Sequence, residues 1–207
     1  MSKSNIFFNI IVPTKNRKNT LEFTLKTILN QNYEDYKIII LDNNSTDGTD
    51  KFIKSLNNQS IIYEKSNFDL PMHVNWERGI KFCEKGFVTI LGDDDGLCPN
   101  ALNELNIFLS GNETQIVSWS PNCYHWLNIG NEKKNEVEIY FASNKKNKFS
   151  KFDSDTILKR VIDMSLLYLE SPMIYNSFVD INLIKKIKQK KRIIFFFLMV
   201  SLIYIQV

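Results

Sequence analysis

Glycine is scarce in this sequence. Only 7 of the 207 residues are glycine, and neither G-x-G-x-x-G nor G-x-x-x-x-G-K-[ST] occurs. These two loops are the commonest backbone cradles for nucleotide phosphates. Their absence argues against a Rossmann dehydrogenase and against a P-loop nucleotide hydrolase.

Cysteine and net charge are also low. The three cysteines, Cys83, Cys98 and Cys123, are an odd number without C-x-x-C spacing, which is typical of reduced thiols in a cytosolic protein. The net charge of +3, from 26 basic and 23 acidic residues, is too small to indicate a nucleic-acid binder. With 43% hydrophobic and 24% charged residues, the composition indicates a globular chain. Its length favours one large α/β domain over two small ones.

No apolar run has the length of a transmembrane helix. The run over 6–12 is interrupted by Asn9 and ended by Pro13, so it predicts a buried strand and not a signal peptide. Residues 193–207 are almost wholly apolar and follow a basic segment over 185–192, yet they fall short of the ~20 residues that span a bilayer. Three interpretations stay open for this tail: an element of the domain core, an anchor on a membrane surface with the basic cluster on anionic lipid, or the product of a frameshift in an AT-rich gene.

Strands and helices alternate along the first 110 residues. A helix over 47–56 would be capped by Ser45 or Thr46. Such alternation predicts an α/β fold with a mainly parallel central sheet and helices on both faces, in three α/β/α layers. The predicted strands are 7–12, 37–41, 61–64, 87–91 and 116–119, the predicted helices are 19–30, 47–56, 72–83 and 101–109, and the later predictions are a hairpin strand over 136–141 and helices over 156–167 and 180–190.

Polar residues follow the predicted strands, at 13–17, 42–44, 65–66 and 92–95. In a parallel sheet, ligands bind outside the carboxyl ends of the strands. The sharpest of these segments is Asp93-Asp94-Asp95, because three adjacent carboxylates are costly unless a cation neutralises them. Carboxylates suit Mg²⁺ or Mn²⁺, and such an ion could bridge a diphosphate and stabilise it as a leaving group. The alternative is an acidic turn that caps the helix near Pro99, but the position directly after a strand favours the metal.

Two further residues at strand ends have two interpretations each. Asp42 could accept a hydrogen bond from a base N–H or a ribose hydroxyl, or it could satisfy backbone N–H groups in the turn that follows. Arg17 could pair with phosphate through its fork of donors, or it could be an ordinary surface residue.

Three stretches together resemble the family 2 glycosyltransferases of the GT-A fold, over about residues 6–110. They read IIVPTKNR, LEFTLKTILNQNYEDYKIIILDNNSTDGT and NWERGIKFCEKGFVTILGDDDGLCPNAL, in this order. The resemblance implies a nucleotide-sugar donor, a Mn²⁺ or Mg²⁺ ion and inversion at the anomeric carbon. It also implies bacterial glycan assembly, such as that of capsule or lipopolysaccharide, as a common setting.

The resemblance also assigns roles by position. Pro13, Thr14 and Lys15 would line the nucleotide pocket, although Lys15 stands where the family often has an aromatic residue. Asp95 would be the metal ligand, although a triple Asp leaves the register of the DxD motif ambiguous. The remaining donor-binding assignments are Asp42 to the base, Asp93 and Asp94 to the ribose and diphosphate, and Arg78 to the diphosphate, with a helix-surface charge as the alternative for Arg78.

The general base is the least defined residue. In this family it is a carboxylate in the second half of the domain, and Glu170 is the predicted one because Ser171-Pro172 places it in a loop. The other candidates are Asp153, Asp155, Asp163 and Asp180.

The resemblance divides the chain into a donor-binding half over 1–120, a partial acceptor-side half over 121–190 and the apolar tail over 191–207. The predicted protein is an inverting glycosyltransferase in the cytoplasm, at the inner face of the membrane if the tail is an anchor. Its donor would be a nucleotide-diphosphate sugar, with UDP favoured by family frequency, and its acceptor a hydroxyl of a glycan or lipid-linked glycan. The alternative is a catalytically inactive, truncated nucleotide-binding fragment.

Overall fold

The computed structural model describes residues 5–119, 123–126, 137–140 and 176–190. The chain divides into two compact units. The first consists of Met1–Val117 with Phe178–Phe196, and the second of Ser118–Ser177 with Phe197–Val207. The two units are described separately below.

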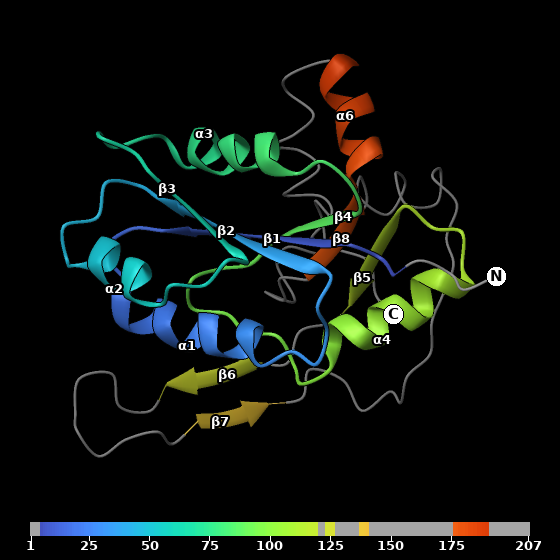
Figure 1. Cartoon of the computed structure of the whole chain (residues 1–207), viewed down its shortest axis with the longest axis horizontal. Coiled ribbons are helices and arrows are strands. Elements are labelled where there is room, and N and C mark those ends of the chain that lie inside the picture. Colours follow the sequence, from blue (N-terminus) through green and yellow to red (C-terminus); the bar gives the residue numbers. More distant parts are fainter. Residues whose placement is uncertain (1–4, 120–122, 127–136, 141–175, 191–207) are drawn as a thin grey trace, which may run out of the picture. The chain divides into compact units, whose positions relative to one another are not determined.

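A six-stranded sheet forms the centre of the first unit (Figure 1). Its strands are β1 (Phe8–Thr14), β2 (Tyr36–Asp42), β3 (Ile61–Lys65), β4 (Phe87–Ile90), β5 (Ile116–Trp119) and β8 (Asn176–Asp180). The helices are α1 (Lys18–Leu29), α2 (Thr49–Ser55), α3 (Met72–Glu77), the 3-10 helix η1 (Arg78–Phe82), α4 (Ala101–Gly111) and α6 (Ile181–Lys190).

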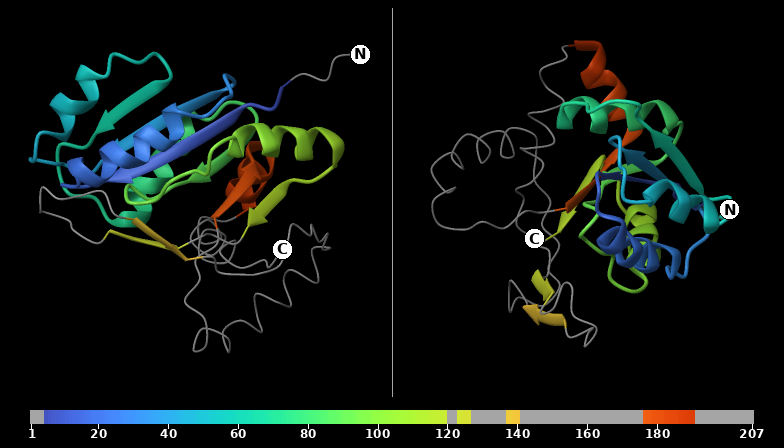
Figure 2. Two further views of the ribbon diagram at one scale, coloured as in Figure 1. Left: turned by 90° about the horizontal axis from the view of Figure 1, so that it is seen from below. Right: turned by 90° about the vertical axis from the view of Figure 1, so that its left-hand side faces the viewer.

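The strand order is β3-β2-β1-β4-β8-β5. β1 pairs in parallel with both β2 and β4, β2 pairs in parallel with β3, and β8 runs antiparallel to β4. Helix α3 lies on one face of the sheet, whereas α1 and α4 lie on the other (Figures 1 and 2). The predicted mainly parallel sheet between helical layers is therefore confirmed, and β8 is an additional strand that the sequence did not predict.

The core follows directly from the apolar pattern. Residues 38–41 of β2 have no exposed surface, as expected for a parallel strand that is covered on both faces. On α1, Leu21, Leu25 and Ile28 are buried, and their spacing places them on one face of the helix. This face packs the helix onto the sheet and fixes the loop that joins β1 to α1.

β1 is longer than predicted and includes Pro13 and Thr14. Its pairing with β4 ends at Ile11, whereas its pairing with β2 continues until Thr14 lies beside Asp42. Pro13 therefore has a neighbouring strand on one side only, where proline is tolerated. As a result, the carboxyl ends of β1 and β2 are level, and the loops that follow them emerge side by side.

The predicted cap of the second helix was wrong. α2 begins at Thr49 after Gly48, which has a left-handed φ of +85°. The side chain of Asp47 accepts hydrogen bonds from the Thr49 N–H at 3.2 Å and from its hydroxyl at 2.6 Å. Ser45 instead uses its hydroxyl to accept the N–H of Asn16 at 2.9 Å, so it joins the loops after β1 and β2.

The described part of the second unit contains an antiparallel pair, β6 (Cys123–Trp126) and β7 (Val137–Tyr140). This confirms the predicted hairpin strand over 136–141. The predicted helix over 156–167, the candidate base Glu170 and the apolar tail over 191–207 lie outside the described residues. None of the helices within the described ranges is both long enough and apolar enough to cross a membrane.

Candidate active site

Residues from three loops meet at the carboxyl ends of β1, β2 and β4. Among them is Asp93, which is only 6% exposed. The hydroxyl of Thr14 donates a hydrogen bond to Asp93 Oδ2 at 2.7 Å, and Arg17 Nη1 donates to Asp93 Oδ1 at 3.2 Å. Burial raises the pKa of Asp93, and these two donors oppose that rise. Two predicted site residues thus hold a carboxylate that is costly to ionise.

Arg17 also contacts the next residue of the acidic turn. Its Nη1 lies 2.8 Å from Asp94 Oδ2. The charges of Asp93 and Asp94 raise the pKa of Arg17, so its guanidinium stays protonated. The turn before it depends on Asn16, whose φ of +53° is left-handed and whose amide oxygen accepts the Thr46 N–H at 2.7 Å. Asparagine adopts this conformation more readily than most residues.

Asp95, the third carboxylate of the turn, contacts Gly92 and Thr24. Its Oδ2 accepts the N–H of Gly92 at 3.2 Å, and its backbone oxygen accepts the Thr24 hydroxyl at 2.7 Å. The side chain reaches solvent at the surface, but the protein around it removes enough water for desolvation, followed by repulsion from Asp94, to raise its pKa. A Cβ at Gly92 would lie 2.6 Å from Asp95 Oδ2 and 2.9 Å from Asp94 Oδ1, so a larger residue there would require both carboxylates to shift.

The acidic turn fits a divalent cation that is held jointly with a ligand. Among the described residues, no three His, Cys, Asp or Glu side chains converge to form a complete metal site. Mg²⁺, however, commonly binds through one or two carboxylates together with substrate phosphates. Asp93, Asp94 and Asp95 offer hard oxygen ligands of this kind, and the contact of Arg17 with the first two shows that the turn attracts a cation.

Asp42 is fully buried. Its Oδ1 accepts the Ser45 N–H at 2.7 Å, and its Oδ2 accepts the Tyr63 hydroxyl at 2.5 Å. Burial, followed by this hydrogen bond, raises the pKa of Tyr63, which keeps the phenol as the donor. Asp42 therefore does satisfy a backbone N–H group in the turn after β2, as its structural interpretation predicts. Its contact with a base remains a prediction, and because Asp42 has no exposed surface in this conformation, that contact requires the residues around it to move.

Arg78 binds the backbone at the ends of two strands. Its Nη2 donates to the carbonyl oxygens of Asp42 and Glu64, both at 2.8 Å, and its Nε donates to Asn75 Oδ1 at 2.9 Å. Desolvation lowers the pKa of its guanidinium. Arg78 is thus not a solvated charge on the helix surface. Its hydrogen bonds join the end of β2 to the end of β3. Its approach to a diphosphate remains a prediction.

The loop after β3 is fastened to both neighbouring loops. Lys15 Nζ lies 2.7 Å from Asp69 Oδ2, and Asn44 Nδ2 lies 3.2 Å from Asp69 Oδ1. The side-chain amide of Asn43 exchanges two hydrogen bonds with the backbone of Leu70, at 2.8 and 2.9 Å. Sequence reasoning missed Asp69 and Tyr63, because no motif marks either residue and their partners are distant in the sequence.

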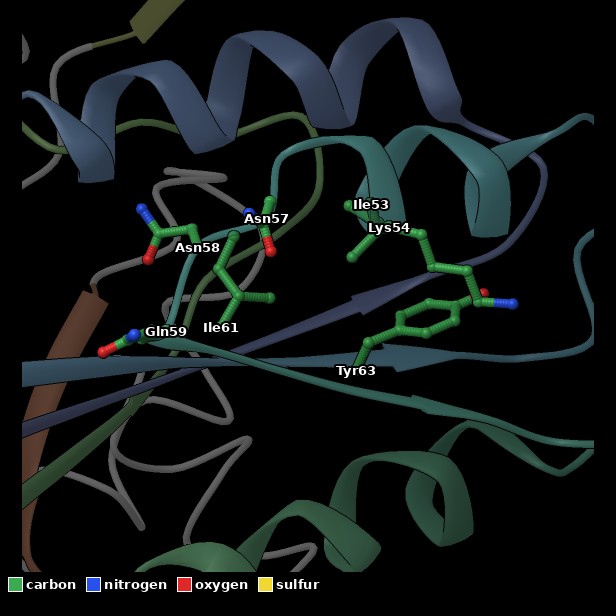
Figure 3. A pocket seen from close by; sticks show the side chains of 7 residues that line it. All are labelled: Ile53, Lys54, Asn57, Asn58, Gln59, Ile61 and Tyr63. Carbon is green, nitrogen blue, oxygen red and sulfur yellow. The ribbon is translucent and has the colours of Figure 1, made fainter.

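A cavity of about 240 Å³ lies between α2 and β3, apart from the acidic turn (Figure 3). Its lining residues are Ile53, Lys54, Asn57, Asn58, Gln59, Ile61 and Tyr63. Tyr63 is the link to the candidate site, because its ring lines the cavity while its hydroxyl reaches Asp42.

The structure thus brings Thr14, Arg17, Asp93 and Asp94 into direct contact and places Asp95 in the same turn. Pro13 lies within β1 opposite Leu41. Of the candidate bases, Asp180 is described, and its carboxylate accepts the N–H of Asn182 at the start of α6 at 2.7 Å. The other four, including Glu170, lie outside the described residues.

Comparison with known proteins finds curated relatives that match about half of this chain. The GalNAc(5)-diNAcBac-PP-undecaprenol beta-1,3-glucosyltransferase of Campylobacter jejuni is 35% identical over 100 residues, which cover 47% of this chain and 32% of that protein. The abequosyltransferase RfbV of Salmonella typhimurium is 33% identical over 109 residues, which cover 50% of this chain and 33% of that protein. The matched part of the chain therefore spans about a third of the length of these curated relatives.

The fold has relatives among solved structures as well. The crystal structure of S. aureus TarS 1–349 in complex with UDP-GlcNAc superposes with a TM-score of 0.52 at 18% identity, over 56% of this chain and 34% of that one. This likeness identifies the GT-A fold. The model of the family described as Glycosyl transferase family 2 matches residues 9–163, well over half of the sequence. On this match, the chain belongs to glycosyl transferase family 2.

Proposed function

We propose that this protein is an inverting glycosyltransferase that moves a sugar from a nucleotide-diphosphate sugar to an acceptor hydroxyl in bacterial surface-glycan assembly. The observation that carries the proposal is the acidic turn Asp93-Asp94-Asp95, which follows a central parallel strand and faces Thr14 and Arg17. Membership of the family and the printed activities of its relatives support the reaction type.

The donor would lie across the carboxyl ends of the strands, where the loops after β1, β2 and β4 meet. Arg17 and Arg78 supply positive charge toward the diphosphate, and Thr14 fixes the carboxylate of Asp93 through its hydroxyl. Pro13 and Lys15 would border the nucleotide, with Asp42 as the proposed partner of the base. Asp93 and Asp94 would contact the ribose and diphosphate.

Asp95 is the proposed ligand of Mn²⁺ or Mg²⁺, which would supply Lewis-acid stabilisation of the departing diphosphate. The rest of the reaction depends on the chain itself. Inversion needs a carboxylate to accept the proton of the acceptor hydroxyl as that oxygen attacks the anomeric carbon. Glu170 remains the proposed base. A glycan or lipid-linked glycan is the proposed acceptor, because the relative from Campylobacter jejuni is named for an undecaprenol-linked one.

Calorimetric titration of UDP into the full chain, with and without Mn²⁺, tests the donor site. UDP is the first probe because TarS, with the same fold, has been crystallised with UDP-GlcNAc, and GDP is the second. We expect binding that requires Mn²⁺ and is lost in Asp95→Asn. The matched control is Glu22→Gln, which removes one negative charge from an exposed ion pair on α1.

Two results would count against the proposal. Absence of binding by both nucleotides to the folded chain would overturn the donor site. If Asp95→Asn kept its full Mn²⁺-dependent affinity, the site would stand but the metal would belong to another carboxylate.

A further inference from the structure

A positive charge lies at the acidic turn. A single guanidinium nitrogen of Arg17 bridges Asp93 Oδ1 at 3.2 Å and Asp94 Oδ2 at 2.8 Å. Without it, the adjacent carboxylates would repel one another, and Asp93 would be ionised in a site with little water. Arg17 therefore acts as the counterion of the turn in this conformation.

The two sides of this ion pair differ in their freedom to move. The side chain of Asp93 is 8% exposed and accepts a hydrogen bond from the Thr14 hydroxyl, whereas the side chain of Arg17 is 54% exposed. The guanidinium therefore covers the carboxylates from the solvent side. Its pair with Asp94 is exposed on both sides, and an exposed ion pair contributes little to stability, so the guanidinium can be displaced while the carboxylates stay in place.

We propose that Arg17 serves as the counterion of the acidic turn until a divalent cation binds there, and that it then passes to the donor diphosphate. This inference rests on the proposed function. A divalent cation at any of the three carboxylates would repel the guanidinium. The diphosphate offers the displaced fork of donors a new anionic partner of matching geometry.

Local geometry favours this exchange. The left-handed turn at Asn16 separates the two cations of the loop after β1. Lys15 pairs with Asp69 after β3, and Arg17 pairs with the turn after β4. Because the backbone of Asn16 is itself held by Ser45, Arg17 can change partners through its side chain alone.

The exchange predicts how metal and nucleotide binding depend on each other. The cation alone must displace Arg17 without giving it a new partner, so it should bind weakly. When the nucleotide is present, Arg17 moves to the diphosphate, so each ligand should strengthen the binding of the other by the same factor. Removing Arg17 should therefore strengthen binding of the cation alone, and it should reduce the factor by which cation and nucleotide strengthen each other's binding.

The experiment measures Mn²⁺ binding to the full chain without nucleotide, by the EPR signal of free Mn²⁺. Arg17→Gln is expected to bind Mn²⁺ about fivefold more tightly than wild type, because a nearby positive charge is removed. Arg17→Lys, which keeps the charge, should stay close to wild type. Lys26→Gln should also stay close, because it removes the same charge from an exposed pair on α1. Arg17→Met keeps the apolar stem and gives a second neutral variant if Arg17→Gln folds poorly.

UDP affinity with and without Mn²⁺ gives the second readout. In Arg17→Gln the strengthening of UDP binding by Mn²⁺ should fall by about fivefold or more. If wild type shows Mn²⁺-dependent UDP binding but neither neutral variant binds Mn²⁺ more tightly, the counterion role of Arg17 is overturned while the proposed function stands. If wild type binds neither Mn²⁺ nor a nucleotide, both are overturned.

Discussion

The hydroxyl of Thr14 lies 2.7 Å from Asp93 Oδ2. This hydrogen bond joins the last residue of β1 to the first carboxylate of the acidic turn. It depends on β1 extending past its last pairing with β4 at Ile11. Because Asp93 is almost fully buried, its charged form depends on Thr14 from one side and on Arg17 from the other.

Thr14→Val should destabilise the protein. The substitution keeps the shape but leaves a buried carboxylate oxygen without its donor, which costs about 1–3 kcal/mol of the free energy of unfolding. Urea unfolding at pH 7 measures this loss. Thr14→Ser keeps the hydroxyl and is expected to lie within ~0.5 kcal/mol of wild type. Equal stability of the valine and serine variants would show that the hydrogen bond contributes nothing.

Tyr63→Phe should cost more stability than Tyr33→Phe. Both hydroxyls donate at 2.5 Å, but Tyr63 donates to the buried carboxylate of Asp42 and Tyr33 to the carbonyl of Ile6. Hydrogen bonds to charged groups contribute about 1.5–3 kcal/mol, against about 1 kcal/mol for neutral pairs. Urea unfolding of the two variants gives the difference. A larger loss in Tyr33→Phe would contradict the importance of the Asp42 contact.

Gly86→Ala should be among the most damaging small substitutions. Gly86 has a φ of +76°, and a Cβ there would lie 1.9 Å from the backbone oxygen of Phe7. Backbone strain and the displacement of β1 together should cost at least ~2 kcal/mol. Gly111→Ala is the matched control, because Gly111 ends α4 with open space around it. It should be neutral or stabilising by up to ~1 kcal/mol. Similar thermal midpoints for the two variants would contradict this strain.

Alternation of strands and helices was enough to predict the first five strands of the sequence and the ends at which polar residues gather. A run such as residues 38–41 is apolar on both faces, so the burial of β2 is visible in the sequence itself. β8 could not be predicted in this way. It is short, and it runs antiparallel to a strand from the first half of the chain, so its neighbour depends on the folded topology.

The residues of the candidate site likewise divide into those that could be predicted from the sequence and those that could not. Thr14 ends β1 and Asp93 lies in the turn after β4, so their position at this edge of the sheet could be predicted from the chain order. The partners of Arg78 are backbone carbonyls, which every residue has, and no side-chain pattern marks them. Asp69 and Tyr63 reach the site only because β3 lies beside β2. Sequence reasoning therefore missed the contacts that a side chain makes with residues brought close only by the pairing of strands, whether their partner is backbone or another side chain.

Arg78→Gln separates a structural from a donor-binding role. Loss of the hydrogen bonds to Asp42 and Glu64 leaves two carbonyl oxygens without their charged donor, which should cost about 2–3 kcal/mol of the free energy of unfolding. UDP affinity is then measured under conditions where the variant is folded. Unchanged stability with weaker UDP binding would show that the diphosphate role dominates, whereas lower stability with unchanged affinity would make Arg78 purely structural.

Alkaline pH should destabilise the protein through groups whose pKa is raised by folding. Burial raises the pKa of Cys83 from 9.0 to about 12, and burial, followed by the charge of Asp35, raises that of Tyr33 from 10.0 to about 12. Between these values the unfolded chain releases protons that the folded chain retains. Stability is therefore complete below pH 9 and falls as the pH rises toward 12, by up to about 1.4 kcal/mol per pH unit for each group.

Urea unfolding under reducing conditions at pH 7.5, 9.0 and 10.5 measures this fall for wild type and Cys83→Ala. At pH 7.5 the alanine variant should be less stable, because a buried side chain is shortened. Its stability should then decrease less steeply than that of wild type, so the two curves converge as the pH rises, because only wild type has the buried thiol to ionise. Parallel curves would show that Cys83 ionises alike in the folded and unfolded chains, and the alkaline loss would then belong to the tyrosines whose pKa folding raises, such as Tyr33.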